Sequence, residues 1–403
     1  MTRSGVLGPV RGLCPVTVLP RSEFLSHAER RSHHDQLVSS FGRKVAAVTI
    51  VSHSRPFVIG VDCHARTHTY AILDPRTGQQ IGCQQFPSTS SGMNRAISWV
   101  ARHAGGDLGT LWVIEGIGAY GARLARAVTQ AGYDAVEAPR MSARARRGIG
   151  KSDPLDAAAI AVAVLGLDET RLRQPRQDEG VRAALRTLAS ARDQLTRERT
   201  VNVNALTALV RVNDLGIDAR KPLTTTQILT ITRWREREEP LEVMIAREEA
   251  IRLARRINDI TAQLDANQKR MTGLIQQSPA APILDITGVG AVTAAVILTA
   301  WSHPDRVRNE AAFASLAGVS PIPASSGNTT RHRLNRGGDR RLNRALHTIA
   351  MVRMTHDPDT RAYVEKRIQE GRTTREIRRA LKRYIARHLY RTLNTLHAAP
   401  MTI

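Results

Sequence analysis

Two aspartates stand three residues apart in the stretch KSDPLDAAAIA, which covers residues 151–161. Asp153 followed by Pro154 is an ordinary way to begin a helix, because an acidic side chain caps free N–H groups and proline occupies a position that needs no amide hydrogen. Asp153 and Asp156 also share one helical face, and such a pair of carboxylates suits a divalent metal ion. The stretch therefore predicts a helix cap, half of a metal site, or both.

Two further acidic residues stand at the ends of predicted β-strands. Asp62 ends the apolar run FVIGVD, and Glu115 ends the run LWVIE. Asp62 alone is explained equally well as a strand-end residue that hydrogen-bonds the following turn. Glu115 is harder to explain in this way, because an ionised carboxylate that ends a buried strand is costly without a partner.

The elements between residues 57 and 165 are those that would bring the four carboxylates together. Three strands joined by short turns come first, and helices and strands then alternate, which predicts a mixed α/β sheet of the ribonuclease-H kind. In such a sheet the first and fourth strands are neighbours, so their carboxyl ends meet at one edge. Four carboxylates at that edge repel one another unless a cation neutralises them. Mg²⁺, a hard ion that prefers oxygen ligands, is the expected cofactor.

The rest of the chain predicts helices. A long helix is predicted by apolar residues spaced by three and four between Val181 and Leu209, which Arg192 and Arg199 interrupt. A second charged helix is predicted over 240–275. Together they favour either an antiparallel coiled-coil arm or an ordinary helical hairpin. After Pro279, the stretch ILDITGVGAVTAAV predicts a helix, a glycine turn and a helix. There Gly288 and Gly290 would turn backbone amides towards a phosphate, as in helix-hairpin-helix elements, or simply allow tight packing.

The composition indicates a polyanionic partner. The 403 residues carry a formal net charge of +23, and only 4% of them are aromatic. This favours a protein that binds nucleic-acid backbones over one that stacks single-stranded bases, although a merely basic protein from a GC-rich genome is the alternative. The densest basic segment predicts a nucleic-acid surface that comprises Arg331, Arg333, Arg336, Arg340, Arg341 and Arg344.

The same composition bears on the compartment. No apolar run is long enough to span a membrane, and the three cysteines form neither a zinc nor a disulfide pattern. We therefore expect a cytoplasmic protein, which would associate with the nucleoid if its polyanionic partner is DNA. Residues 1–55 are expected to be a disordered arm, or to reflect a start codon assigned too far upstream.

Several stretches together resemble the DEDD transposases of insertion-sequence-110-type elements. They are IGVDCHARTHTYAILD, VIEGIGAYG, KSDPLDAAAIA, and the segment that runs from LDITGVGAV through AGVSPIPASSG to RRLNRAL. The resemblance spans roughly 57–395. It implies a RuvC-like domain over 56–170, a helical coiled-coil region over 171–278 and a C-terminal transposase domain over 279–403. It also implies that Asp62, Glu115, Asp153 and Asp156 bind Mg²⁺.

The resemblance further implies a nucleophilic serine. The family's serine lies just before a glycine in the AGVSPIPASSG segment, which indicates Ser326 with Ser325 as its competitor. Attack on DNA would store the energy of the broken bond in a phosphoserine link. Family members recombine a donor and a target DNA under the direction of a structured noncoding bridge RNA. They act as multimers, so a homodimer or homotetramer is expected.

Three other functions are compatible with part of this pattern. A RuvC-like nuclease or junction resolvase would use the same carboxylates with water as the nucleophile, and would leave no covalent protein–DNA link. An actin-like kinase shares the first strand and hairpin but needs more glycine-rich phosphate turns than the single GVG. A non-catalytic nucleic-acid-binding protein, such as a decayed transposase, would have no use for four acidic residues in these positions.

Overall fold

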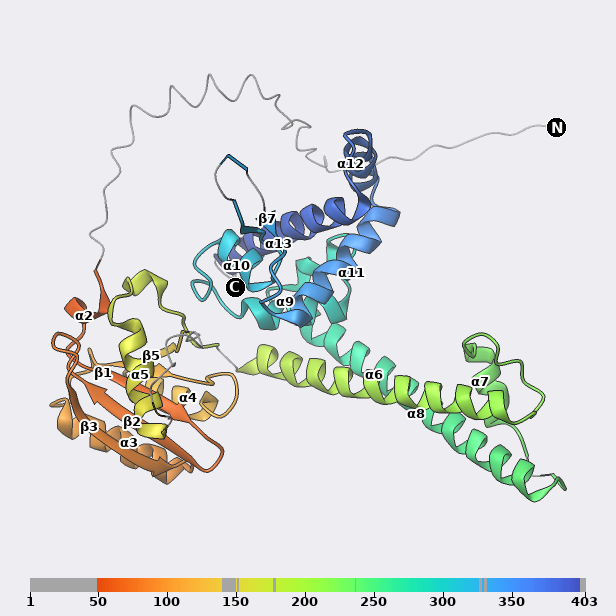
Figure 1. Cartoon of the computed structure of the whole chain (residues 1–403), viewed down its shortest axis with the longest axis horizontal. Coiled ribbons are helices and arrows are strands. Elements are labelled where there is room, and N and C mark those ends of the chain that lie inside the picture. Colours follow the sequence, from red (N-terminus) through yellow and green to blue (C-terminus); the bar gives the residue numbers. More distant parts are fainter. Residues whose placement is uncertain are drawn as a thin grey trace, which may run out of the picture. The chain divides into compact units, whose positions relative to one another are not determined.

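The computed structural model describes residues 49–139, 150, 152–176, 179–235, 237–325, 328–329 and 332–398 (Figure 1). Residues 1–48 of the predicted arm lie outside this range, as do Ser326 and Arg331. Among the described residues, no helix combines the length and apolar character needed to cross a membrane.

Five strands form one mixed sheet in the order β3-β2-β1-β4-β5. Their bounds are Val58–Cys63 (β1), Thr67–Leu73 (β2), Gln80–Pro87 (β3), Leu111–Ile114 (β4) and Asp134–Glu137 (β5). The strands β1, β2 and β3 pair antiparallel, whereas β1 with β4 and β4 with β5 pair parallel. The prediction that the first and fourth strands are neighbours is therefore confirmed.

Helices cover both faces of this sheet (Figure 1). Side chains alternate along a strand, so Ile59 and Val61 pack into the core shared with α3 (Ser90–His103) and α4 (Ala122–Gln130). Val58 packs on the opposite face, in a core that includes residues of α5 (Asp153–Leu165). One helix, α5, thus covers the face on which Gly60 and Asp62 also lie.

The sheet domain includes residues 49–55, which the sequence assigned to the arm. The short helix α2 (Val51–Ser54) places Val51 in the core beneath α5, and its N–H donates to the Leu167 carbonyl at 3.0 Å. Arg55 binds Glu169, at the start of the 3₁₀ helix η2 (Glu169–Arg171), through two hydrogen bonds of 2.7 Å. These contacts explain why this segment is folded.

Two long helices, α6 (Gly180–Val212) and α8 (Leu241–Gln276), lie antiparallel and side by side (Figure 1). The polar residues that interrupt the predicted apolar spacing bond across the pair: Arg192 donates to the Leu264 carbonyl at 2.8 Å, and Arg199 donates to Thr261 at 3.0 Å. A coiled coil therefore stays a prediction, because polar side chains form hydrogen bonds across the middle of this interface.

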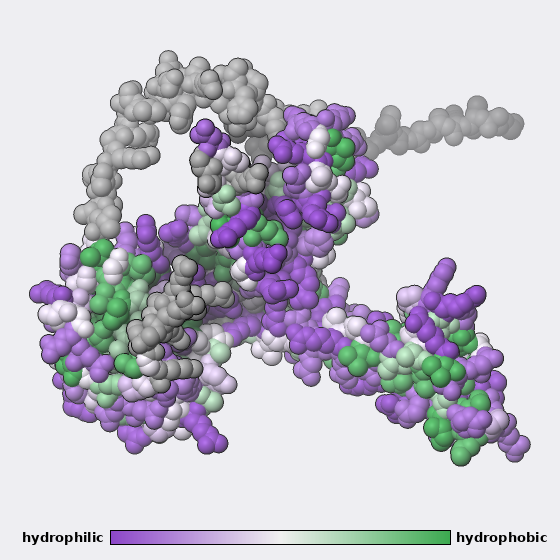
Figure 2. Space-filling view, in the orientation of Figure 1, coloured by the Kyte–Doolittle hydropathy of each residue, from purple (hydrophilic) through white to green (hydrophobic). Residues whose placement is uncertain are grey.

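A third helix, α7 (Thr225–Thr232), completes an apolar cluster at one end of this pair. Figure 2 shows hydrophobic residues on the visible surface there, and Val212 and Leu241 are 85% and 69% exposed. Part of the apolar surface at this end therefore faces solvent. The sequence did not predict α7.

The C-terminal part is helical and shares its core with the other end of α6 and α8. Its helices are η3 (Ala281–Asp285), α9 (Ala291–Trp301), α10 (Glu310–Leu316), α11 (Arg340–His356), α12 (Pro358–Gln369) and α13 (Thr374–Ala398). A two-stranded ribbon of β6 (Ile322–Pro323) and β7 (His332–Arg333) separates α10 from α11. In the sequence, residues 324–331 link these two strands and include Ser325 and Ser326.

Candidate functional site

Asp62 and Glu115 end neighbouring parallel strands at the same level. The register pairs Val61 with Ile114, and the N–H of Glu115 continues this ladder by donating to the Val61 carbonyl at 3.0 Å. Val58 on β1 and the alternate residues of β4 face α5, so the same alternation places both carboxylates on the α5 face. The sheet thus brings together the first two predicted site residues.

Gly60 determines how closely α5 approaches this edge. A Cβ atom at Gly60 would lie 2.0 Å from the carbonyl oxygen of Ala157 and 2.7 Å from the backbone nitrogen of Ala161. Only glycine therefore leaves room for the backbone of α5 to lie directly on β1. This contact is two residues from Asp62 on the strand and one helical turn from Asp153 on the helix.

The helix begins at Asp153, as predicted, but its cap is Ser152. Ser152 has extended backbone angles, and its carbonyl accepts from the N–H of Asp156 at 2.9 Å. The prediction that Asp153 caps the helix is therefore wrong by one residue. Asp153 and Asp156 instead both lie in the first turn, where the positive end of the helix dipole favours negative charge.

The pKa of Asp62 depends on its burial and on the three other carboxylates. Asp62 is only 7% exposed, and burial raises the pKa of its carboxyl above the usual value, while His64 lowers it. The charges of Glu115, Asp153 and Asp156 each raise the same pKa further. Glu115 itself is exposed, so the argument that it would be a buried charge is wrong. The acidic edge is partly buried at Asp62 and open to solvent at Glu115.

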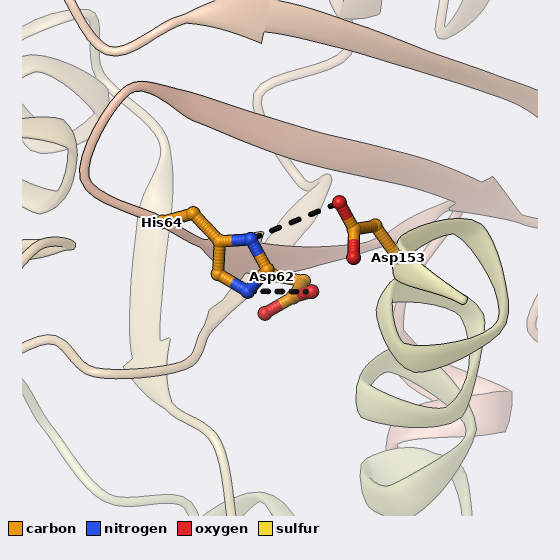
Figure 3. Close-up of side chains that lie close together, drawn as sticks. All are labelled: Asp62, His64 and Asp153. Carbon is orange, nitrogen blue, oxygen red and sulfur yellow. Dashed lines mark ion pairs between the residues drawn. The ribbon is translucent and has the colours of Figure 1, made fainter. Parts of the chain in front are cut away.

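His64, which was not predicted as a site residue, lies between two of these carboxylates (Figure 3). Its Nε2 is 3.5 Å from Asp62 Oδ2, and its Nδ1 is 3.7 Å from Asp153 Oδ2. One ligand atom from each of the three residues lies within 4.8 Å of the others, a spacing that suits a metal ion. The signal in the sequence was the spacing of two between Asp62 and His64, which places both on one side of an extended chain.

Polar residues continue from Asp62 across the sheet. Thr69 on β2 is directly opposite Asp62, and Gln85 on β3 is directly opposite Thr69. Thr69 is buried, and its hydroxyl accepts a hydrogen bond of 3.3 Å from the amide of Gln85. The acidic edge therefore has a neutral hydrogen-bonding extension on the same face.

The glycine turn before α9 has structural explanations. Gly288 has a φ of +86°, and a Cβ atom there would lie 3.0 Å from the Ile349 carbonyl oxygen of α11. The N–H of Gly290 donates to the Thr293 hydroxyl at 3.0 Å. Tight packing therefore accounts for Gly288, and phosphate binding by this turn stays a prediction.

The predicted basic surface divides into two groups. Arg333, Arg336 and Arg340 are exposed, which suits contact with a nucleic acid. Arg341 and Arg344 approach Asp193 of α6, with nitrogen–oxygen distances of 2.6 and 3.6 Å, although the Arg344 side chain is also 69% exposed. These two arginines connect α11 to α6.

The serine loop is described only in part. Ser325 is exposed and is the second residue after strand β6, whereas Ser326 lies outside the described residues. The structure therefore does not distinguish the two serines by contacts.

Comparisons with known proteins agree with this arrangement. A family model described as a transposase, of the DEDD type of IS110, matches residues 59–212, and one described as the IS116/IS110/IS902 transposase family matches residues 280–365. The first therefore covers all four acidic residues, and the second covers Ser326. This chain belongs to the IS110 family of DEDD transposases.

Two relatives of this IS110-family transposase are themselves encoded by insertion elements. The chain is 27% identical to the "Insertion element IS900 uncharacterized 42 kDa protein" of Mycobacterium paratuberculosis, over 86% of this chain and 96% of that protein. It is 32% identical to the "Insertion element IS110 uncharacterized 43.6 kDa protein" of Streptomyces coelicolor, over 30% of each chain. The longer match carries the relation from the sheet domain into the C-terminal helices.

Proposed function

We propose that this IS110-family transposase cuts and rejoins DNA strands in metal-dependent transposition. The observation that supports the proposal is the electrostatics of Asp62, whose pKa is raised by burial and, further, by the charges of Glu115, Asp153 and Asp156. A buried carboxylate whose charge three other carboxylates destabilise fits a site that a cation completes. The donors are oxygen atoms, which favours Mg²⁺.

The four carboxylates have the task of holding and orienting the ion. Asp62 and Glu115 are fixed by the hydrogen bonds of β1 and β4, and Asp153 and Asp156 by the contact of α5 with Gly60. A divalent ion bound there would polarise a phosphodiester and stabilise the charge that develops on its oxygens. Rigid elements on both sides keep these ligands in place while the DNA is exchanged.

We assign the nucleophile to Ser326, with Ser325 as the competitor. The serine oxygen would form a bond to phosphorus while the bond from phosphorus to a deoxyribose oxygen breaks. The serine proton would pass to solvent or a nearby base, and the departing oxygen would become a hydroxyl group. Because the new phosphoserine ester replaces the broken one, the reverse attack by a DNA hydroxyl can rejoin strands without ATP.

The partners in this proposal are donor DNA, target DNA and a structured noncoding RNA. The exposed Arg333, Arg336 and Arg340 follow the serine loop in the sequence and would bind phosphates near it. A positively charged protein with few aromatic residues fits recognition of paired backbones by shape. A homodimer or homotetramer would allow the serine of one subunit to act with the carboxylates of another.

The proposal is tested by recombination in vitro with the purified chain, Mg²⁺, donor and target DNA, and RNA transcribed from the DNA that flanks the gene. Ser326→Ala should abolish both the covalent protein–DNA adduct and recombination, and Ser325→Ala should retain them. Asp156→Asn should remain folded by circular dichroism and lose all Mg²⁺-dependent steps. Cleavage by Ser326→Ala without any adduct would instead indicate a RuvC-like nuclease that uses water.

A further inference from the structure

The backbone of His64 is held in place by the sheet. His64 is the first residue after β1, and its N–H donates to the Thr67 carbonyl at 3.0 Å. This bond closes the turn between β1 and β2 and keeps the chain extended as far as His64. The imidazole therefore lies on the same face as the side chain of Asp62, which precedes His64 by two residues.

The spacing around the imidazole leaves room for an ion. Its Nε2 lies 3.5 Å from Asp62 Oδ2, and its Nδ1 lies 3.7 Å from Asp153 Oδ2. Both distances exceed the 2.7–3.2 Å of a normal N–H···O hydrogen bond. Ligands that bind one metal at about 2.0–2.2 Å lie roughly 3 Å apart when they are adjacent. Small rotations of these side chains would therefore bring one ring nitrogen and two carboxylate oxygens to a common ion.

An ordinary surface ion pair is the other explanation of this arrangement. Such a pair would bring one ring nitrogen to hydrogen-bond distance of one carboxylate, whereas here each nitrogen stays at a similar, longer distance from a different one. The side chain of His64 is 52% exposed, so solvent and an ion can reach it. The geometry thus favours a ligand position over a closed ion pair.

We propose that His64 supplies a nitrogen ligand to the divalent ion that Asp62 and Asp153 hold. This inference rests on the proposed function, since it assumes that the acidic edge binds a metal ion. Imidazole is a poorer ligand for Mg²⁺ than oxygen but suits the transition metals. This transposase should therefore bind Mn²⁺ more tightly, relative to Mg²⁺, than a site of oxygen ligands alone.

The test measures metal binding by the full-length protein without DNA. Mn²⁺ is titrated against wild type and His64→Ala, and pulsed electron paramagnetic resonance of the bound Mn²⁺ reports whether a ¹⁴N nucleus is coupled to it. We expect ¹⁴N coupling in wild type, its loss in His64→Ala, and an affinity for Mn²⁺ about 10-fold weaker in that variant. Mg²⁺ affinity, measured by competition, should change much less.

Two controls make the result specific. His53→Ala removes an exposed histidine before β1, at the end of the strand opposite the acidic edge, and should change neither the coupling nor the affinity. Asp153→Asn should weaken the binding of both ions. Thermal unfolding of each variant shows that the fold is retained.

The outcomes separate the two proposals. Wild type that binds Mn²⁺ without ¹⁴N coupling, or His64→Ala that keeps the coupling, overturns the role of His64 and leaves the carboxylate site intact. Wild type that binds neither ion overturns both the role of His64 and the metal site of the proposed function. The measurement on wild type alone suffices to refute the inference, even if a variant were unstable.

Discussion

Gly60→Ala should separate the two halves of the acidic site without changing any of its ligands. Gly60 has an extended backbone in β1 that an alanine also adopts, so only the space above it is affected. The new Cβ atom would lie 2.0 Å from the Ala157 carbonyl oxygen, whereas ordinary contact begins at 3.4 Å. The helix α5 must therefore retreat from β1 by about 1.4 Å.

This displacement predicts both a stability and an activity effect. Overpacking of this size destabilises a domain by about 1–3 kcal/mol, which the sheet domain should survive. A misplacement of about 1 Å between the groups of an active site lowers the rate by roughly 100-fold. Asp153 and Asp156 move with the helix while Asp62 and Glu115 stay on the strands, so we expect a loss of that order in the Mg²⁺-dependent cleavage rate.

The assay is single-turnover cleavage of donor DNA at saturating Mg²⁺, together with thermal unfolding. The matched control is Gly166→Ala at the C-terminal end of the same helix, where φ is −88° and no atom lies within 4 Å of the added carbon. The control should cleave at the wild-type rate. A Gly60→Ala protein that is folded and also cleaves at that rate would refute the reasoning that this contact positions the carboxylates.

Four further substitutions test the charges. Asp62→Asn should raise the melting temperature of the metal-free protein at neutral pH, because the raised pKa of Asp62 means that its ionised form destabilises the fold. This gain in melting temperature should vanish as the pH falls to the usual range of an aspartate. A gain that does not depend on pH would contradict this cause. Glu169→Gln should lower the free energy of unfolding by about 1 kcal/mol at neutral pH, since the hydrogen bonds from Arg55 lower the pKa of Glu169. In urea titrations, the difference from wild type should shrink as the pH falls below the usual range of a glutamate. A difference that stays constant with pH would contradict this role of Arg55. Arg336→Ala should lower the slope of the logarithm of nucleic-acid affinity against the logarithm of salt concentration by about 1, with no change in melting temperature. Arg341→Ala should lower the melting temperature, because it breaks the ion pair with Asp193 of α6. Equal behaviour of the two variants would contradict the division of the basic surface.

The sheet and the carboxylate edge were predictable because local signals determine them. Alternating and continuous apolar runs mark the strands, and the order of strands and helices leaves few ways to connect them. Once β1 and β4 are neighbours, Asp62 and Glu115 must lie side by side. The helix start at Asp153 was predictable from Pro154, but whether Ser152 or Asp153 is the cap depends on backbone angles that the residue types do not distinguish.

The parts that were not predictable depend on contacts between distant segments. Val51 belongs to the fold because it reaches Leu167, and nothing in the composition of the first 55 residues indicates that partner. Arg341 has the same character as the exposed Arg340, and only Asp193 on another helix distinguishes it. His64 was visible as a residue near Asp62, but its relation to the metal site becomes evident only when α5 brings Asp153 to it.

The rigidity of the acidic edge links metal binding to stability. Burial raises the pKa of Asp62, and the charges of Glu115, Asp153 and Asp156 raise it further; side chains at a flexible site would relieve this repulsion by moving apart. The contact between Gly60 and α5 and the ladder between β1 and β4 limit that movement of the backbone, so protonation or a bound cation would relieve the repulsion. A ligand that binds only the folded protein raises its stability by an amount that grows with ligand concentration. Mg²⁺ and Mn²⁺ should therefore raise the melting temperature of wild type more than that of Gly60→Ala, in which α5 can move away and the carboxylates repel less. An equal rise in both proteins would mean that the carboxylates adjust independently of the helix, and that the close contact at Gly60 serves packing alone.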